Sequence, residues 1–308
     1  MPENFTAFVI EDVGGKPKGG FTTLTLADLP DNDVLVEVAC STLNYKDGLA
    51  VSGKGRIARK LPMVAGIDLA GTVVESRSPA WKPGDKVVAN GWGLSETQWG
   101  GYTRFQRLKA EWLTRLPDAF SFEEAMGIGT AGYTAALCVD ALERWGALRP
   151  GGKEVLVTGA AGPKRTTICV AWGPPASSTA PPFWKREPPC RRSAGPAVST
   201  RWAGRRWSTR CRRPRGGGAI AACGLAGSSD LPGTVLPHIL RGVALLGVDS
   251  VMAPPDRRDA AWTRLARDLD RNALTTMYEV QPFGALPELA TKILAGTIRG
   301  RIVIDVTR

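Results

Sequence analysis

The chain has 308 residues, 43% hydrophobic and 22% charged, a composition typical of soluble globular proteins with room for two domains. It contains no run of eighteen apolar residues and no secretory leader pattern, so we expect no membrane span and a cytoplasmic location. The net charge is +11, but residues 163–215 carry thirteen Lys and Arg against one acid, and the remainder carries 27 basic and 28 acidic side chains.

Residues 1–120 have the pattern of a β-rich domain. A strand is predicted at 33–40, followed by a polar loop, and the run 64–76 alternates small and β-branched residues. The segment "KPGDKVVA" is a Pro-Gly turn that leads into another strand.

At Ser121 the pattern becomes helical. Ser121 and Glu124 have the spacing of a capping box, and apolar residues then recur at helical spacing to Leu148. A short strand, 155–157, leads into a glycine-rich turn. This strand–turn order predicts a parallel sheet.

Regular patterns return after residue 215. Strands are predicted within 216–227 and 240–254, and an amphipathic helix within 256–270, with apolar residues on one face and arginines opposite. The chain closes with a helix at 286–295, a stop at Gly296 and a strand at 300–306.

Residues 163–215 show neither helical nor strand periodicity. They contain nine prolines, four tryptophans and three cysteines. Such density of proline disfavours helices and central strands. One hypothesis is a basic linker that binds an anionic partner, although linkers of this kind are usually poor in Trp and Cys. The hypothesis we favour is translation out of frame from a GC-rich gene.

Metal chemistry has little support. The six cysteines are widely spaced, and the single histidine, His238, is interpreted as structural or solvent-facing. A zinc site needs clustered ligands, so we expect no metal.

Eight short motifs occur in an order that resembles one known family. They are "LNYKDGLA", "GIDLAGTV", "PGDKV", "GWG…WGGY", "GTAGYTA", "VTGAAG", "AACGLAG" and "GVDSVMAPP". The chain is similar to the zinc-independent, quinone-oxidoreductase-like branch of the medium-chain dehydrogenase/reductase superfamily, and within it to acrylyl-CoA reductases. The resemblance covers roughly 5–162 and 216–306 and fails across 163–215.

The resemblance implies an α/β fold of two domains. A GroES-like β-rich substrate domain would comprise residues 1–120 and 256–308. A Rossmann domain with a doubly wound parallel sheet, incomplete here, would comprise 121–255 and bind NADPH. The family implies a homodimer formed through the edge strand at 242–250. Asn44 and Ile67 occupy positions where zinc-dependent relatives have Cys and His, which agrees with the absence of a metal.

The implied reaction is hydride transfer to the β-carbon of an α,β-unsaturated thioester, or to a quinone as the alternative substrate. The implied catalytic residues are Asn44, Tyr45, Asp47 and Asp68. An amide and a phenol can donate hydrogen bonds to the developing enolate oxygen, and Asp68 could orient Lys46 or a water. The structural alternatives are a turn carboxylate for Asp47 and a partner of a backbone N–H for Asp68.

The implied cofactor contacts come from both parts of the chain. They are Tyr45, Thr130, Gly159, Ala160, Ala161, Gly162, Leu225, Ile239, Ser250 and Arg301. Arg301 could equally be a surface charge beside the last strand.

The phosphate-binding turn departs from the family. Small residues there let backbone N–H groups approach a pyrophosphate at a helix N-terminus. The family has Gly-Val-Gly-Ser where this chain has Pro163, Lys164, Arg165 and Thr166. We therefore expect weak NADPH binding. The alternative from another class is a non-enzymatic scaffold whose basic segment binds nucleic acid.

Overall fold

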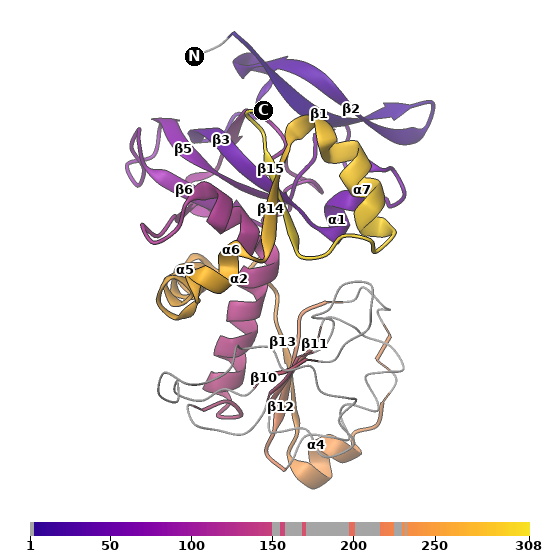
Figure 1. Cartoon of the computed structure of the whole chain (residues 1–308), viewed down its shortest axis with the longest axis vertical. Helices are drawn as coiled ribbons and strands as arrows, with labels where there is room; N and C mark the ends of the chain where they lie inside the picture. Colours follow the sequence, from indigo (N-terminus) through magenta and orange to yellow (C-terminus); the bar gives the residue numbers. More distant parts are fainter. Residues whose placement is uncertain are drawn as a thin grey trace. The chain divides into compact units, whose positions relative to one another are not determined.

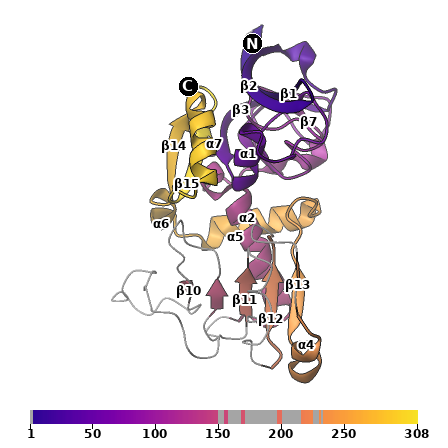
Figure 2. The ribbon, with the colours of Figure 1, turned by 90° about the vertical axis from the view of Figure 1, so that its right-hand side faces the viewer.

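The computed structural model describes residues 3–149, 155–157, 168–170, 197–200, 216–224, 230–231 and 233–308. Its contacts divide the chain into two units (Figures 1 and 2). The first unit comprises residues 1–133 and 250–308, and the second comprises 134–249. That the first holds the substrate and the second the cofactor stays a prediction.

The first unit is built on two sheets. The larger has the strand order β14-β15-β3-β5-β6-β8, with β7 also paired to β3, and the smaller has the order β2-β1-β4. Their strands are β1 Asn4–Val13, β2 Lys16–Thr25, β3 Val34–Leu43, β4 Met63–Val64, β5 Asp68–Ser76, β6 Lys86–Asn90, β7 Phe105–Leu108, β8 Thr114–Arg115, β14 Tyr278–Pro282 and β15 Arg301–Asp305. This confirms the β-rich pattern expected of a GroES-like fold.

Strand β3 is the centre of this unit, because it pairs with β5, β7 and β15. It continues three residues beyond the predicted end, and helix α1 (Tyr45–Val51) stands where a polar loop was expected. Asn44 caps α1 in a capping box with Asp47, a signal that the sequence prediction overlooked. Helix α7 (Leu286–Leu294) contacts α1 and covers the same side of the core (Figure 1).

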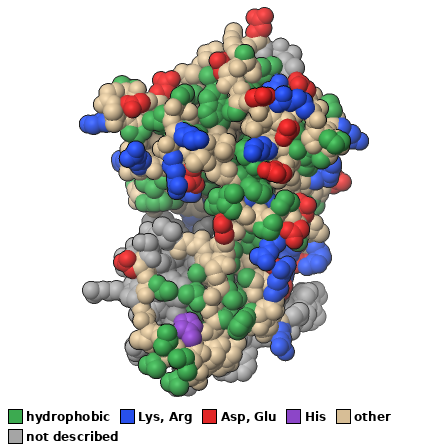
Figure 3. Space-filling model, turned by 180° about the vertical axis from the view of Figure 1, so that it is seen from behind, with side chains coloured by type: hydrophobic (Ala, Val, Ile, Leu, Met, Phe, Trp, Pro, Cys, Tyr) green, Lys and Arg blue, Asp and Glu red, His purple; other side chains and the backbone are tan. Residues whose placement is uncertain are grey.

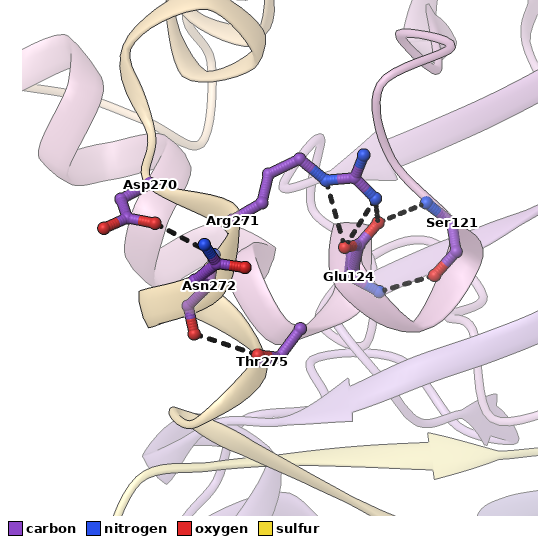
Figure 4. Close-up of polar contacts among 6 residues, drawn as sticks. All are labelled: Ser121, Glu124, Asp270, Arg271, Asn272 and Thr275. Carbon is purple, nitrogen blue, oxygen red and sulfur yellow. Dashed lines mark hydrogen bonds and ion pairs between the residues drawn. The ribbon is translucent and has the colours of Figure 1, made fainter.

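Helix α2 (Phe122–Arg144) begins at the predicted capping box. The Ser121 N–H donates to Glu124 Oε2 at 2.8 Å, and the Glu124 N–H donates to Ser121 Oγ at 3.1 Å. Arg271, the first residue of α6 (Arg271–Thr275), donates to both oxygens of Glu124 at 2.8 and 2.9 Å (Figure 4). The cap therefore also fastens α6 to the start of α2.

Helix α2 is long and apolar enough to cross a membrane by length and composition, and 61% of its apolar window is buried in the structure. Such burial is what the core helix of a globular protein shows, so this is weak evidence for a membrane span.

Helix α5 (Pro255–Asp268) and the 3₁₀ turns η1 (Leu26–Asp28), η2 (Ala110–Trp112) and η3 (Phe283–Ala285) complete the first unit. The expectation that α5 places its arginines opposite the apolar face is wrong for Arg258, which is 2% exposed. The predicted stop at Gly296 is observed just after α7, with φ +69°.

The second unit holds a five-stranded sheet of order β10-β9-β11-β12-β13. Its elements are β9 Val155–Val157, β10 Ile168–Val170, β11 Ala197–Thr200, β12 Ala219–Ala222, β13 Ala244–Gly247 and helix α4 Leu236–Arg241. Strands β9, β11, β12 and β13 are parallel, as in a Rossmann-type sheet, and β10 is antiparallel at one edge. Cys138 and Leu142 of α2 pack against Ala219 and Ala221 of β12.

The expectation that 163–215 contains no regular structure is wrong at two places, β10 and β11. Both are runs of three or four residues that include Val, Ile or Thr, and such runs are too short for a period of two to stand out. The frame-slip hypothesis concerns the same segment, most of which lies outside the described residues.

Candidate functional site

The carboxylate of Asp68 is the centre of a buried polar cluster in the first unit. Asp68 begins β5 and has no exposed surface. Its Oδ2 accepts from Asn44 Nδ2 at 2.8 Å and from the Thr130 N–H at 3.2 Å, while Oδ1 accepts from Asn90 Nδ2 at 2.6 Å and from Thr130 Oγ1. These four donors match the four lone-pair positions of a carboxylate.

A break inside α2 presents Thr130 to this carboxylate. Gly129 adopts φ 49° and ψ −163°, so the helix stops and starts again at Thr130. The backbone N–H and the hydroxyl of Thr130 then both reach Asp68, which acts as an acceptor at the start of the second helical half. A Cβ at position 129 would lie 2.9 Å from Thr42 Cγ2, and its positive φ strains any residue with a side chain, so this site favours glycine.

The amide of Asn44 links Asp68 to a second carboxylate and to a cation. Arg301 Nη2, which can only donate, gives a hydrogen bond to Asn44 Oδ1 at 3.0 Å. Asn44 Nδ2 then donates to Asp68 at 2.8 Å and to Asp47 at 3.0 Å. Because one neighbour is an obligatory donor and the others are acceptors, only one orientation of the amide fits.

Asp47 is fully buried beside this amide. Its Oδ1 accepts from the Ile67 N–H at 3.0 Å and its Oδ2 from the Asn44 N–H at 2.8 Å. Burial, followed by the charge of Asp68, raises the pKa of Asp47 to about 7, against the opposing effect of these hydrogen bonds. The structural alternative for Asp47, a turn carboxylate, therefore has direct geometric support.

Two predicted roles are corrected by these contacts. Both N–H bonds of the Asn44 amide end on carboxylates, so this amide positions Asp47 and Asp68 and is not aimed at a substrate oxygen. Asp68 does not orient Lys46, whose Nζ lies 2.6 Å from Glu96 Oε1. Tyr45, the first residue of α1, is 50% exposed, and its role as a donor to the substrate stays a prediction.

The predicted cofactor contacts fall into three groups. Thr130 and Arg301 are part of the Asp68 cluster, and Arg301 also donates to Thr42 Oγ1 at 3.0 Å and to the Gly127 carbonyl at 3.3 Å. Ser250 is half-buried in the first unit, while Ile239 is 73% exposed on α4 of the second. Residues 159–162 and Leu225 lie outside the described residues.

His238, interpreted as structural or solvent-facing, has a structural contact. Its Nδ1 lies 2.6 Å from the Val243 carbonyl, which joins α4 to the segment before β13. Val235, Leu236, Ile239 and Leu240, on α4 or at its N-cap, are exposed. Figure 3 shows apolar side chains near the histidine.

Sequence reasoning missed Asn90, which supplies one of the four donors to Asp68. Asn90 ends β6 and stands directly opposite Asp68 in the antiparallel register of β5 and β6. Each residue taken alone looks like a polar strand end. The signal lies in the pairing of the strands, which periodicity does not provide.

The contacts of Asn44 and Ile67 bear on the expectation that no metal binds. Among the described residues no group of three His, Cys, Asp or Glu is arranged to hold a metal ion. The Asn44 amide is bonded to carboxylates, and Ile67 contributes a backbone N–H to Asp47. Within this cluster, the oxygens of Asp47 and Asp68 accept hydrogen bonds from protein N–H and O–H groups.

Comparison with known proteins gives consistent matches. Residues 30–118 match the alcohol dehydrogenase GroES-like domain. The chain is 40% identical to the acrylyl-CoA reductase AcuI of Ruegeria pomeroyi, over 98% of this chain and 99% of that protein. The YhdH oxidoreductase of Salmonella enterica, solved with NADP, is 38% identical with a TM-score of 0.85, over 97% of this chain and 99% of that one. Bacillus subtilis YhfP, solved with NAD, is 32% identical with a TM-score of 0.85, over 99% and 100%.

Proposed function

Because the chain belongs to the medium-chain dehydrogenase/reductase superfamily, we propose that it uses NADPH to reduce the C=C bond of an acrylyl-CoA-type thioester. The observation that carries this proposal is the Asp68–Asn44–Arg301 cluster, together with Tyr45, which follows Asn44 in the chain and is 50% exposed. A buried, fully hydrogen-bonded cluster fixes the start of α1, and Tyr45 is the residue at that start.

The described residues fit the nicotinamide end of such a cofactor. Thr130 Oγ1 donates to Asp68 and keeps lone pairs that can accept from a ribose hydroxyl. The residues that would contact the phosphates, 158–166, lie outside the described part of the chain. Bound NADPH would supply the hydride from its nicotinamide ring.

The chain's own groups act on the substrate oxygen. Reduction of the C=C bond needs a hydride at the β-carbon and a proton at the α-carbon, which water supplies. Negative charge grows on the thioester carbonyl oxygen as the β-carbon receives hydride, and a donor aimed at that oxygen lowers the barrier. We assign this donation to the Tyr45 hydroxyl. Asn44 and Asp47 hold the helix start that carries Tyr45, since both side chains bond within the capping box of α1.

Kinetics of Tyr45→Phe test this assignment. Loss of one donor to a developing oxyanion typically lowers kcat by roughly a hundredfold. We expect that loss with acrylyl-CoA, little change in KM and an unchanged Tm. A variant with unaltered kcat would remove Tyr45 from the mechanism.

A quinone is the alternative substrate, because a quinone carbonyl also gains negative charge on reduction. Steady-state kcat/KM for acrylyl-CoA and for a benzoquinone, measured side by side, decides between them. We expect the thioester to be preferred, and a preference for the quinone would overturn the substrate assignment.

We further propose a homodimer located in the cytoplasm. Strand β13 ends the second unit's sheet, where it offers backbone groups for pairing with another chain. Light scattering tests the mass, for which the dimer predicts twice 32.8 kDa. The nucleic-acid alternative predicts oligonucleotide binding that weakens steeply with salt, and we expect no such binding.

A further inference from the structure

Helix α5 turns two polar side chains into the core of the first unit. Arg258 and Trp262 are spaced i, i+4 and therefore share one face of the helix. They are only 2% and 1% exposed. Burying a guanidinium costs free energy unless its N–H groups are hydrogen-bonded.

Trp262 and Asp68 contact opposite ends of one amide. The indole Nε1–H of Trp262 lies 3.3 Å from Asn90 Oδ1, and Asn90 Nδ2 lies 2.6 Å from Asp68 Oδ1. An indole N–H can only donate and a carboxylate can only accept, so the Asn90 amide has one compatible orientation. Without the indole N–H, a flipped amide would turn its oxygen toward the carboxylate.

Arg258 bonds the backbone of Asn90 and of a second segment, residues 250–253. Its guanidinium lies 4.1 Å from the centroid of the Trp92 ring. The guanidinium donates to the carbonyls of Asn90 at 2.5 Å, Ala253 at 2.7 Å, Val251 at 2.7 Å and Ser250 at 3.4 Å. One side chain thus joins the end of β6 to the segment by which the chain re-enters the first unit.

We propose that Arg258 and Trp262 are positioning residues for the reaction, which hold Asn90 in the orientation that donates to Asp68. The proposal rests on the proposed function for its catalytic consequence. Asp68 also accepts hydrogen bonds from Asn44 and from the N–H and hydroxyl of Thr130. The Asn90 amide is therefore one of four donors that fix this carboxylate. If the Asn90 side chain changed orientation, Asp68 would be held less firmly, and so would Asn44, which caps the helix that begins at Tyr45.

The test is a double-mutant cycle between Trp262→Phe and Asn90→Ala. Phenylalanine keeps most of the packing and removes the indole N–H. Loss of one neutral hydrogen bond corresponds to about a fivefold change in an equilibrium constant. We expect Trp262→Phe to lower kcat about fivefold with little change in KM. In the Asn90→Ala background the same substitution should have almost no effect, because its target is gone.

Trp81→Phe is the matched control. Its indole donates to the Ala110 carbonyl at 3.0 Å, a backbone contact that does not involve the Asp68 cluster. We expect this variant to keep its kcat. An equal loss of kcat from Trp262→Phe in both backgrounds would overturn the proposal, since Trp262 would then act through packing alone.

The unfolding equilibrium constant gives a readout that does not depend on turnover. Trp262→Phe should raise it in both backgrounds through lost packing, and about fivefold more in the wild-type background than with Asn90→Ala. A wild-type chain without reductase activity would contradict the proposed function, whereas absence of this coupling would contradict the positioning role.

Arg258→Lys gives a second test, because lysine keeps the charge but cannot bond several carbonyls as a fork. We expect it to lower kcat with little change in KM, and an unchanged kcat would exclude Arg258 from this role.

Discussion

Replacing Asp47 by Asn should abolish the loss of folding stability that ionisation of Asp47 causes as the pH rises from about 4 to about 7. The pKa of Asp47 is raised from 3.8 to about 7, first by burial and then by Asp68. The folded chain therefore binds this proton more tightly than the unfolded chain does. Stability from this group is greatest at low pH and is lost as the pH rises from about 4 to about 7.

The magnitude follows from the shift itself. One pKa unit corresponds to about 1.4 kcal/mol, so a rise from 3.8 to about 7 corresponds to roughly 4 kcal/mol over the whole interval. About 3 kcal/mol of this falls between about pH 5 and about pH 8. The asparagine side chain places an NH₂ group where one carboxylate oxygen accepts, which adds a cost that does not depend on pH. The comparison therefore concerns the slope of stability against pH.

Urea unfolding at several pH values measures this slope. We expect the free energy of unfolding of the wild type to fall relative to Asp47→Asn between about pH 5 and about pH 8. Asp85→Asn is the control, because hydrogen bonding to Arg115 lowers the pKa of Asp85 and moves its effect to more acidic pH. Parallel curves for the wild type and Asp47→Asn would refute the description of Asp47 as a buried acid that titrates near neutrality.

Three further outcomes are expected. Gly129→Ala should destabilise the chain by about 2 kcal/mol in urea unfolding, because of its positive φ and crowded Cβ, whereas Gly284→Ala, with open space around its Cβ, should not. Arg271→Met should cost about 1 kcal/mol by the same assay, because it removes the bidentate partner of Glu124, and equal stability would show that the capping box alone suffices. Replacing residues 163–166 by Gly-Val-Gly-Ser should tighten NADPH binding at least about tenfold by nicotinamide fluorescence, since backbone donors are restored. An unchanged Kd would mean that the basic side chains already serve the phosphates.

The sequence was most informative where a pattern is local. The capping box at Ser121, the stop at Gly296 and the strand at 155–157 depend on residues close together in the chain. Helix α1 was missed although Asn44 and Asp47 have the capping-box pattern, because its seven residues are too few for helical periodicity.

The functional cluster was predictable only in part. Family resemblance supplied Asn44, Asp68 and Arg301, but their contacts depend on strand register and on the break at Gly129. A glycine inside a helical pattern does not reveal that it adopts a positive φ. Arg258 was placed on the solvent face because arginine usually lies there, and burial against backbone carbonyls overrides that tendency.

Reduction of acrylyl-CoA with NADPH deuterated at the transferable position of the nicotinamide tests whether the protein transfers hydride from NADPH to the thioester. NADPH is supplied at high concentration, since weak binding is expected, and the product is examined by mass spectrometry. We expect propionyl-CoA that carries one deuterium on its β-carbon. Folded protein that oxidises no NADPH, or that forms product without deuterium, would contradict it.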